Sequence, residues 1–451
     1  MGSGKTAVSR RRFMQGAAAG AMAFSLVPRR VLAQAGQPAP SDKLNLGCVG
    51  VAGRGGDNIN ELAGQNIVAL TDVDWAHAAK TLEKFPGAKR YKDYRKMLDE
   101  MDKSIDAVVV STPDHTHAVA AMAAIKRGKH VYCEKPLAHS VWEVRQLMQA
   151  AREHKVVTQL GNQGHSFDHI RMFCEWIWDG AIGKVTEVHA RCGSNYSKIR
   201  RLEEVAKAGE VAVPDMLDWD LWLGPAQHRP YHRAYLPGQW RGWMPFGCGV
   251  IGDWVCHVVD PVFWALKLGA PTSVQARTFD YNPTDHADTF PPRSIVRYDF
   301  PARGDLPPVT LMWYDGEARP PRPAELESGR KDLDTGAIVV GDKGKIMYGS
   351  HGAGGARIIP ESKMKEYKQP AKSLPRVKNH HADWVAAIRD GKAAGSDFSY
   401  GGPLTEIALL GVIAMRLSGQ RLDWDGANMR FTNSDEANKL LTPTFRMGWS
   451  L

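Results

Sequence analysis

Short apolar runs alternate with helical stretches over the first third of the chain. Strand-like runs lie at residues 44–49, 67–71, 107–111 and 130–133, and helical stretches separate them. Parallel strands need a long crossover between them, and a helix is the usual crossover. The pattern therefore predicts an α/β domain with a parallel sheet over residues 43–165.

Beyond residue 165 this alternation ends. Strand-like runs recur with few helices between them, at 185–192, 274–279, 294–300, 309–314, 338–340 and 346–348. Such a series favours one large, mainly antiparallel sheet. We expect an α+β domain over residues 166–451, with helices at 380–389 and 404–417. Pro403 is expected at the first position of the second helix.

A glycine-rich turn follows the first strand, and the second strand ends at an acid. The turn reads Gly50-Val51-Ala52-Gly53-Arg54-Gly55, and the acid is Asp72. This is the Rossmann fingerprint, in which glycines admit the pyrophosphate and the acid accepts the ribose hydroxyls. The residues expected to bind a dinucleotide are Gly50, Ala52, Gly53, Arg54, Gly55 and Asp72. Because Asp72 repels a 2′-phosphate and no Arg follows it directly, NAD is favoured over NADP.

Polar residues also follow the later strands of this half. Ligands of open α/β sheets bind at the carboxyl ends of the strands. Further cofactor contacts are therefore predicted at Thr112, Pro113, His115, His117, Glu134, Lys135, Pro136 and Asn162.

Asp253 and His257 form a candidate catalytic pair. They are four residues apart, so on a helix they share one face. A carboxylate beside an imidazole can orient the ring and raise its basicity, which suits proton removal from an alcohol. The alternative is a core histidine with Asp253 as a helix N-cap. Asp260 is interpreted as structural.

Six tryptophans between residues 219 and 264 are interleaved with polar side chains. Aromatic faces beside hydrogen-bonding groups suit a sugar ring, and Trp240 and Arg241 are expected to contact the substrate. Such stretches also build cores and oligomer interfaces. Four histidines, His115, His117, His165 and His169, resemble a metal set by spacing alone, and no metal is expected. The six cysteines contain no CxxC pair and are expected to be buried free thiols.

Several of these motifs occur together in one known family. The GxAGRG turn, STPDHTH at 111–117, CEKP at 133–136, GNQG at 161–164 and GDWVCH at 252–257 follow one another along the chain. In order and approximate spacing the sequence resembles the glucose–fructose oxidoreductase / inositol dehydrogenase (Gfo/Idh/MocA) family, from residue 44 to about 425. The resemblance implies that Lys135 contacts a substrate hydroxyl beside the nicotinamide and that the Lys135–Pro136 peptide is a candidate cis bond. It also implies catalytic roles for Asp253 and His257, and subunits that pair through the C-terminal sheet.

The first 35 residues resemble a twin-arginine signal peptide. Arg10-Arg11-Arg12 precedes an uncharged run at 16–27 and the small-x-small site Ala33-Gln34-Ala35, and a linker follows at 36–42. This predicts export to the periplasm. The net charge of +9 falls to +3 without these residues, which argues against a nucleic-acid partner. The chain contains no uninterrupted run of 18 or more apolar residues, so no permanent membrane span is predicted.

Together these features predict an NAD-dependent oxidoreductase for a sugar, glycoside or polyol. His257 would be the general base, Lys135 would polarise the reacting hydroxyl, and Asp253 would orient the base or the substrate. Export in the folded state favours a tightly bound cofactor that is recycled within each cycle. An NAD-dependent glycoside hydrolase ranks second, because such enzymes on this fold include a branch that departs from the EKP motif kept here. A non-catalytic sugar-binding protein ranks third, since all three catalytic candidates are present.

Overall fold

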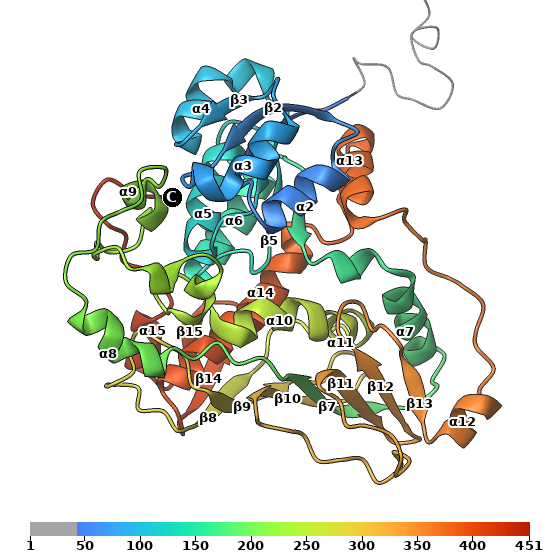
Figure 1. Ribbon diagram of the computed structural model, residues 1–451. Helices are drawn as coiled ribbons and strands as arrows, with labels where there is room; N and C mark the ends of the chain where they lie inside the picture. Colours follow the sequence, from blue (N-terminus) through green and yellow to red (C-terminus); the bar gives the residue numbers. More distant parts are fainter. Residues whose placement is uncertain (1–42) are drawn as a thin grey trace, which may run out of the picture. The chain divides into compact units, whose positions relative to one another are not determined.

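The computed structural model describes residues 43–451, which form two sheets and the helices packed on them (Figure 1). The predicted signal peptide and linker, residues 1–42, lie outside the described residues.

The first sheet has six parallel strands in the order β3-β2-β1-β4-β5-β6. Its strands are β1 Asn45–Val49, β2 Asn66–Thr71, β3 Lys89–Tyr91, β4 Ala107–Val110, β5 His130–Glu134 and β6 Thr158–Gly161. Its helices are α2 Arg54–Glu61, α3 Trp75–Lys84, α4 Tyr94–Glu100, α5 Asp114–Ile125 and α6 Val141–Glu153. The strand order reverses between β1 and β4, and such switch points are where open α/β sheets bind ligands. The predicted Rossmann topology is confirmed.

The second sheet has nine strands in the order β13-β12-β11-β7-β10-β9-β8-β14-β15. They are β7 Val185–Cys192, β8 Ser273–Phe279, β9 Arg293–Phe300, β10 Val309–Gly316, β11 Thr335–Gly341, β12 Lys345–Gly349, β13 Arg357–Ile359, β14 Arg421–Asp425 and β15 Arg430–Phe431. Neighbours are antiparallel except β7 and β10. The mainly antiparallel sheet is confirmed, and its short strands β13, β14 and β15 were not predicted.

The helices of the second half lie around this sheet and against the first domain. They are α7 Asp168–Trp178, α8 Ile199–Lys207, α9 Trp219–Leu223, α10 Gly249–Val258, α11 Asp260–Ala265, α12 Glu361–Glu366, α13 His380–Asp390, α14 Phe398–Arg416 and α15 Asp435–Lys439. Helix α14 contacts α6 and β6 of the first domain and β8, β9 and α10 of the second. Buried apolar side chains therefore run without a break from one sheet to the other.

Helix α14 begins at Phe398, so the prediction that Pro403 opens it is wrong. The Asp397 side chain caps the helix by accepting the N–H groups of Ser399 and Tyr400, and Pro403 lies inside. Interior proline costs a hydrogen bond, but tight packing holds the first turns in place. A Cβ on Gly401 would lie 2.7 Å from the Leu160 side chain.

Helix α14 is long enough and apolar enough to span a membrane. In its most apolar window, however, 78% of the helix is buried inside the protein. This burial is typical of the core helix of a folded domain.

Residues 216–246, here named the tryptophan segment, have a small core of their own. Its buried members are Leu217, Trp219, Trp222, Leu223, Ala234, Tyr235, Trp243 and Phe246. The segment is joined to the end of β2 by two backbone hydrogen bonds, from Asp218 N–H to Val73 O at 2.9 Å and from Trp75 N–H to Met216 O at 3.2 Å. It therefore lies beside the carboxyl ends of the parallel strands.

Candidate active site

A cavity of about 910 Å³ opens at the carboxyl ends of the parallel strands. Its walls are the glycine turn after β1, the ends of β2, β4 and β5, the tryptophan segment, and helix α10. Trp449 and His351 also line it, although both are far from the other lining residues in sequence. The cavity is thus built from both domains.

The glycine turn can receive a pyrophosphate. Gly50 has a φ of +77°, and a Cβ on this residue would lie 2.8 Å from the Ser111 backbone. A Cβ on Gly55 would lie 1.8 Å from the Gly50 carbonyl oxygen. Only glycine fits these two positions. Gly53 is the N-cap residue of helix α2, and no side chain caps this helix. The first N–H groups of the helix can therefore bind an anion.

Asp72 holds this turn in place. Its Oδ2 accepts the N–H groups of Val51 at 2.8 Å and Ala52 at 3.3 Å, and its Oδ1 accepts the N–H of Asp74 at 3.0 Å. Burial raises the pKa of Asp72, and these donors oppose the rise. The carboxylate lines the cavity and also shapes the turn, and its contact with the ribose hydroxyls stays a prediction.

The residues after β4 divide between the cavity and the tryptophan segment. Thr112, Pro113 and His117 line the cavity. The Thr112 hydroxyl oxygen is buried and has no partner within residues 43–451, and a bound group would satisfy it. The His117 ring nitrogens lie 2.7 Å from Pro136 O and 2.8 Å from Thr112 O. His117 therefore ties together the loops after β4 and β5.

Two cofactor assignments from the strand ends are wrong. The His115 ring nitrogens lie 3.0 Å from Trp222 O and 3.2 Å from Phe246 O, outside the cavity lining. Burial lowers the pKa of His115 to about 3, so this ring is a neutral anchor of the tryptophan segment. Asn162 is also outside the lining and donates to Asp260 Oδ2 at 3.2 Å. Both side chains form hydrogen bonds with residues from the second half of the chain.

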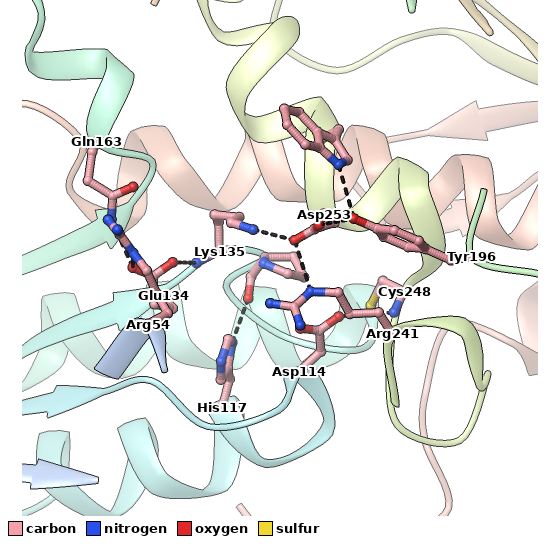
Figure 2. A network of polar contacts seen from close by, with 12 residues as sticks. Arg54, Asp114, His117, Glu134, Lys135, Gln163, Tyr196, Arg241, Cys248 and Asp253 are labelled. Atoms are coloured by element: carbon pink, nitrogen blue, oxygen red, sulfur yellow. Dashed lines mark hydrogen bonds and ion pairs between the residues drawn. The ribbon is translucent and has the colours of Figure 1, made fainter. Parts of the chain in front are cut away.

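Glu134 fixes the wall between the turn and Lys135. Its Oε1 accepts hydrogen bonds from Arg54 Nε at 3.2 Å and Gln163 Nε2 at 2.8 Å (Figure 2). It also accepts one from Asn58 Nδ2 at 3.0 Å. Among the residues predicted to contact the cofactor, Arg54 lines the cavity, whereas Gly55 and Pro136 are not part of its lining.

Lys135 and Asp253 form a buried ion pair that lines the cavity (Figure 2). The Lys135–Pro136 peptide is cis, as the family resemblance implied. The two side chains are 13% and 14% exposed. Tyr196 OH donates to Asp253 Oδ2 at 2.7 Å, and Arg241 Nε lies 3.4 Å from Oδ1. The carboxylate thus joins one lysine, one arginine and one phenol.

Electrostatics keep both members of this pair charged. Burial alone would raise the pKa of Asp253, but Lys135 and Arg241 outweigh it and hold this pKa below the ordinary value. Burial works to lower the pKa of Lys135, whereas Asp253 and Glu134 raise it above the ordinary value. The site therefore presents a lysine ammonium to the cavity at neutral pH.

His257 lies on α10 and faces a second imidazole. Its ring centroid is 4.1 Å from that of His351, and its Nδ1 is buried with no partner in the described chain. Burial, and then Lys135, lower the pKa of both rings. The expected contact between Asp253 and His257 is not formed, because the carboxylate is engaged by Lys135, Tyr196 and Arg241. Helix α10 begins at Gly249, so Asp253 is not an N-cap either.

Most of the clustered tryptophans are structural. Trp219 and Trp222 stack on each other, Trp243 is buried in the same core, and Trp264 stacks on His165. Trp240, under the Arg241 guanidinium, and Trp254 line the cavity. Sequence reasoning missed Tyr196 and His351, since both come from loops without a recognisable motif.

The remaining histidine and cysteine assignments can be checked directly. His165 hydrogen-bonds Asp260, whose carboxylate also accepts from Tyr400, so Asp260 has the structural role expected. Within residues 43–451, no three His, Cys, Asp or Glu side chains are grouped to hold a metal ion. All six cysteines are buried free thiols, as expected.

Two family models match most of the described chain. The oxidoreductase family model with an NAD-binding Rossmann fold covers residues 44–162, and the C-terminal α/β domain model of the same family covers 184–300 and 326–451. The chain belongs to the Gfo/Idh/MocA oxidoreductase family. Its cofactor is therefore NAD, and the glycine cradle and the unpartnered Thr112 hydroxyl fit that group.

Curated relatives match about a third of this chain. Inositol 2-dehydrogenase of Salmonella typhimurium is 30% identical over 154 residues, which are 33% of this chain and 45% of that protein. The 1,5-anhydro-D-fructose reductase of Ensifer adhaerens is 29% identical over 170 residues, 37% of this chain and 39% of that protein. The chain thus spans less than half the length of these relatives.

Solved structures match over both domains and show the fold. A levoglucosan dehydrogenase in complex with NADH and levoglucosan has a TM-score of 0.56 at 18% identity, covering 84% of this chain and 99% of that one. The WlbA dehydrogenase of Bordetella pertussis, in complex with NADH and UDP-GlcNAcA, has a TM-score of 0.56 at 17% identity, covering 85% and 99%.

Proposed function

We propose that the protein oxidises a ring hydroxyl of a sugar or polyol with NAD. The observation that carries this proposal is the buried Lys135–Asp253 ion pair, which lines the same cavity as His257 and the glycine turn. Trp240 and Trp254 give that end of the cavity apolar faces suited to a sugar ring. The names of the relatives, which act on inositol and on an anhydro sugar, support the same substrate class.

Each residue has a defined chemical task. Bound NAD supplies the hydride acceptor. The Lys135 ammonium donates a hydrogen bond to the reacting hydroxyl oxygen and favours its ionised form. His257, neutral at physiological pH, accepts the hydroxyl proton. Asp253 keeps Lys135 charged, and Tyr196 and Arg241 hold Asp253 in place.

A substrate panel tests this function. Purified protein with NAD is offered aldoses, cyclitols and aryl glycosides, and reduced nicotinamide and released aglycone are followed by absorbance. We expect reduced nicotinamide with at least one sugar or polyol. Aglycone release without net reduction would identify a glycosidase instead. Sugar binding by calorimetry without either signal would identify a binding protein.

The pH dependence of the reaction follows from His257. Its pKa lies well below the ordinary 6.5, because burial, Lys135 and His351 disfavour the charged ring. A histidine accepts a proton only above its pKa, so kcat/KM is expected to stay level as the pH falls through the ordinary histidine pKa and to fall only in stronger acid. A pH series of kcat/KM measures this. An acid limb centred at the ordinary histidine pKa would contradict the assignment.

Asp72 is expected to make NAD bind at least about tenfold more tightly than NADP, because its carboxylate repels a 2′-phosphate. Fluorescence titration with both dinucleotides gives the ratio of the two Kd values. In Asp72→Asn the ratio should shrink, whereas Asp99→Asn, which removes an exposed carboxylate outside the cavity lining, should leave it unchanged. Tighter binding of NADP to the unsubstituted protein would refute the preference.

We also propose that the cofactor is retained between turnovers. Leu221, Trp222 and Leu236 of the tryptophan segment line the cavity, and so does Trp449. The Trp449 ring lies 4.5 Å from the Arg95 guanidinium and 6.5 Å from the Tyr94 ring. These side chains give the cavity that contains Asp72 and the glycine turn bulky apolar walls. A retained cofactor must be reoxidised within each catalytic cycle, by a second substrate, by the same sugar or by a separate electron acceptor.

Retention predicts that extensively dialysed protein still yields nearly one nicotinamide per chain after denaturation. Trp449→Ala should speed cofactor loss on dialysis about tenfold or more, since it removes a large aromatic contact. Met447→Ala is the matched control, because Met447 lies in the same segment and is 97% exposed. A cofactor-free site with activity strictly dependent on added NAD would overturn this proposal.

Export through residues 1–35 is proposed on the sequence alone. Replacing Arg10 and Arg11 with lysine should leave the protein in the cytoplasmic fraction of an expressing bacterium, whereas the unsubstituted chain should reach the periplasm. Equal distribution of the two proteins would refute a twin-arginine signal.

A further inference from the structure

His351 enters the cavity from the second sheet. It lies in the loop after β12, residues 350–355, and has a φ of +49°. Residues with a Cβ rarely adopt this conformation, and it persists where the surroundings enforce it, often at functional sites.

Close backbone packing enforces the position of this loop. A Cβ on Gly164 would lie 2.5 Å from Gly352 N, and a Cβ on Gly352 would lie 2.2 Å from Gly164 O. The loop is therefore in direct backbone contact with the segment that follows β6. His351 is held against the carboxyl ends of the parallel strands, although it belongs to the other domain.

The two imidazoles have unused hydrogen-bonding atoms. His351 Nδ1 lies 3.0 Å from Ser350 Oγ, and its Nε2 has no hydrogen-bonding partner among residues 43–451. His257 Nδ1 is likewise unpartnered in this part of the chain. The Trp254 ring lies edge-on to both, with centroids 6.0 Å from His257 and 5.5 Å from His351. Trp254 is itself tied to Tyr196 by a 3.2 Å hydrogen bond, so both rings have a fixed neighbour.

The charged groups around His351 favour its neutral form. Burial, Lys135 and Arg54 lower its pKa, and Asp253 opposes them. A neutral imidazole has one donor and one acceptor nitrogen, which matches a hydroxyl group. Lys135, His257 and His351 line the same cavity, and the centroids of the two imidazole rings are only 4.1 Å apart.

We propose that His351 binds the hydroxyl adjacent to the one that reacts, so that the enzyme selects substrates with two neighbouring ring hydroxyls. The proposal rests on the function proposed above, in which Lys135 and His257 hold the reacting hydroxyl. His351 then acts as a binding residue that sets specificity. It distinguishes a vicinal diol from a ring alcohol with a single or a distant second hydroxyl.

Simple ring alcohols test this selection without knowledge of the natural substrate. The probes are cyclohexanol, 1,3-cyclohexanediol, the cis and trans 1,2-cyclohexanediols, and myo-inositol. Binding to the NAD-loaded protein is measured by tryptophan fluorescence and by calorimetry. We expect at least one vicinal probe to bind about tenfold more tightly than cyclohexanol and 1,3-cyclohexanediol, because a site built to hydrogen-bond a hydroxyl rejects analogues that lack it.

Three variants separate this role from a structural one. His351→Ala should remove the preference, and His351→Gln, whose amide nitrogen can replace Nε2, should restore part of it. His169→Ala is the control, since His169 is exposed and outside the cavity lining. Thermal melting checks that each variant is folded. If His351→Ala does not fold, the comparison rests on His351→Gln, which should show a smaller preference than the unsubstituted protein.

The outcomes are distinguishable from failure of the proposed function. Equal binding of all probes, no binding of any probe, or an unchanged preference in the His351 variants would overturn the role of His351. A preference that depends on His351, without NAD reduction by any sugar in the panel, would keep this role and refute the oxidoreductase.

Discussion

Replacing Lys135 with methionine is expected to lower kcat/KM by about 10³-fold, within the range for removal of a group that stabilises developing charge. Methionine keeps a similar length but cannot donate to the reacting oxygen. It also leaves Asp253 paired with Arg241 and Tyr196 only, so the group loses one positive charge. Steady-state kinetics on the best substrate of the panel measures the loss. NAD affinity, measured by fluorescence titration, should change less than about threefold, because the glycine turn is untouched.

Lys129→Met is the matched control. Lys129 directly precedes β5 and forms an ion pair with Asp102, whereas Lys135 directly follows the same strand. The two substitutions therefore remove the same charge from opposite ends of one strand. If Lys135→Met kept more than a tenth of the activity, the lysine would not contact the reacting hydroxyl.

The second large effect is expected for Asp253→Asn. The substitution removes the main counter-charge of a buried lysine, and breaking such a pair typically costs about 3–5 kcal/mol. We expect a comparable loss in the free energy of unfolding, measured by chemical denaturation at pH 7. The exposed pair Arg127–Asp99 provides the control, since Asp99→Asn should cost less than about 1 kcal/mol.

The same variant should change the alkaline limb of the activity profile. Asp253 raises the pKa of Lys135, so its removal lowers that pKa. The lysine is charged only below its pKa, and activity should therefore fall at a lower pH in Asp253→Asn than in the unsubstituted enzyme. A pH series of kcat/KM for both proteins tests this. Identical alkaline limbs would show that Asp253 does not control the charge of Lys135.

Local patterns were sufficient to predict the first domain. The alternation of apolar strands and helices predicted the parallel sheet, and the turn at 50–55 with Asp72 predicted the cofactor end of the cavity. These features are encoded over a few neighbouring residues, so periodicity and glycine placement reveal them. Strand β7 matched its predicted bounds for the same reason, because its alternation is strong.

The partners within the site could not be predicted in this way. The spacing of Asp253 and His257 correctly predicted one helix, but the carboxylate pairs with Lys135, which is 118 residues away. Asp253 forms an ion pair with a residue of another element and makes no contact with His257 on its own helix. No local sequence pattern shows such a pair. Tyr196 and His351 reach the cavity from loops for the same reason.

The tryptophan-rich stretch shows a different limit. A sugar platform and a small apolar core both require large aromatic side chains, so composition cannot separate them. Trp219 lies in the core and outside the cavity lining, Trp222 belongs to the same core and also borders the cavity, and Trp240 lines the cavity. Only tertiary packing decides which ring faces outward.

The three backbone N–H groups held by Asp72 have a consequence for protein engineering. Redesign of a dinucleotide site to accept NADP usually begins by exchanging this acid for a small or basic residue. Here that exchange would also remove the acceptor for the N–H groups of Val51, Ala52 and Asp74. A redesigned enzyme must supply a substitute acceptor for the turn, or it will lose affinity for both dinucleotides together.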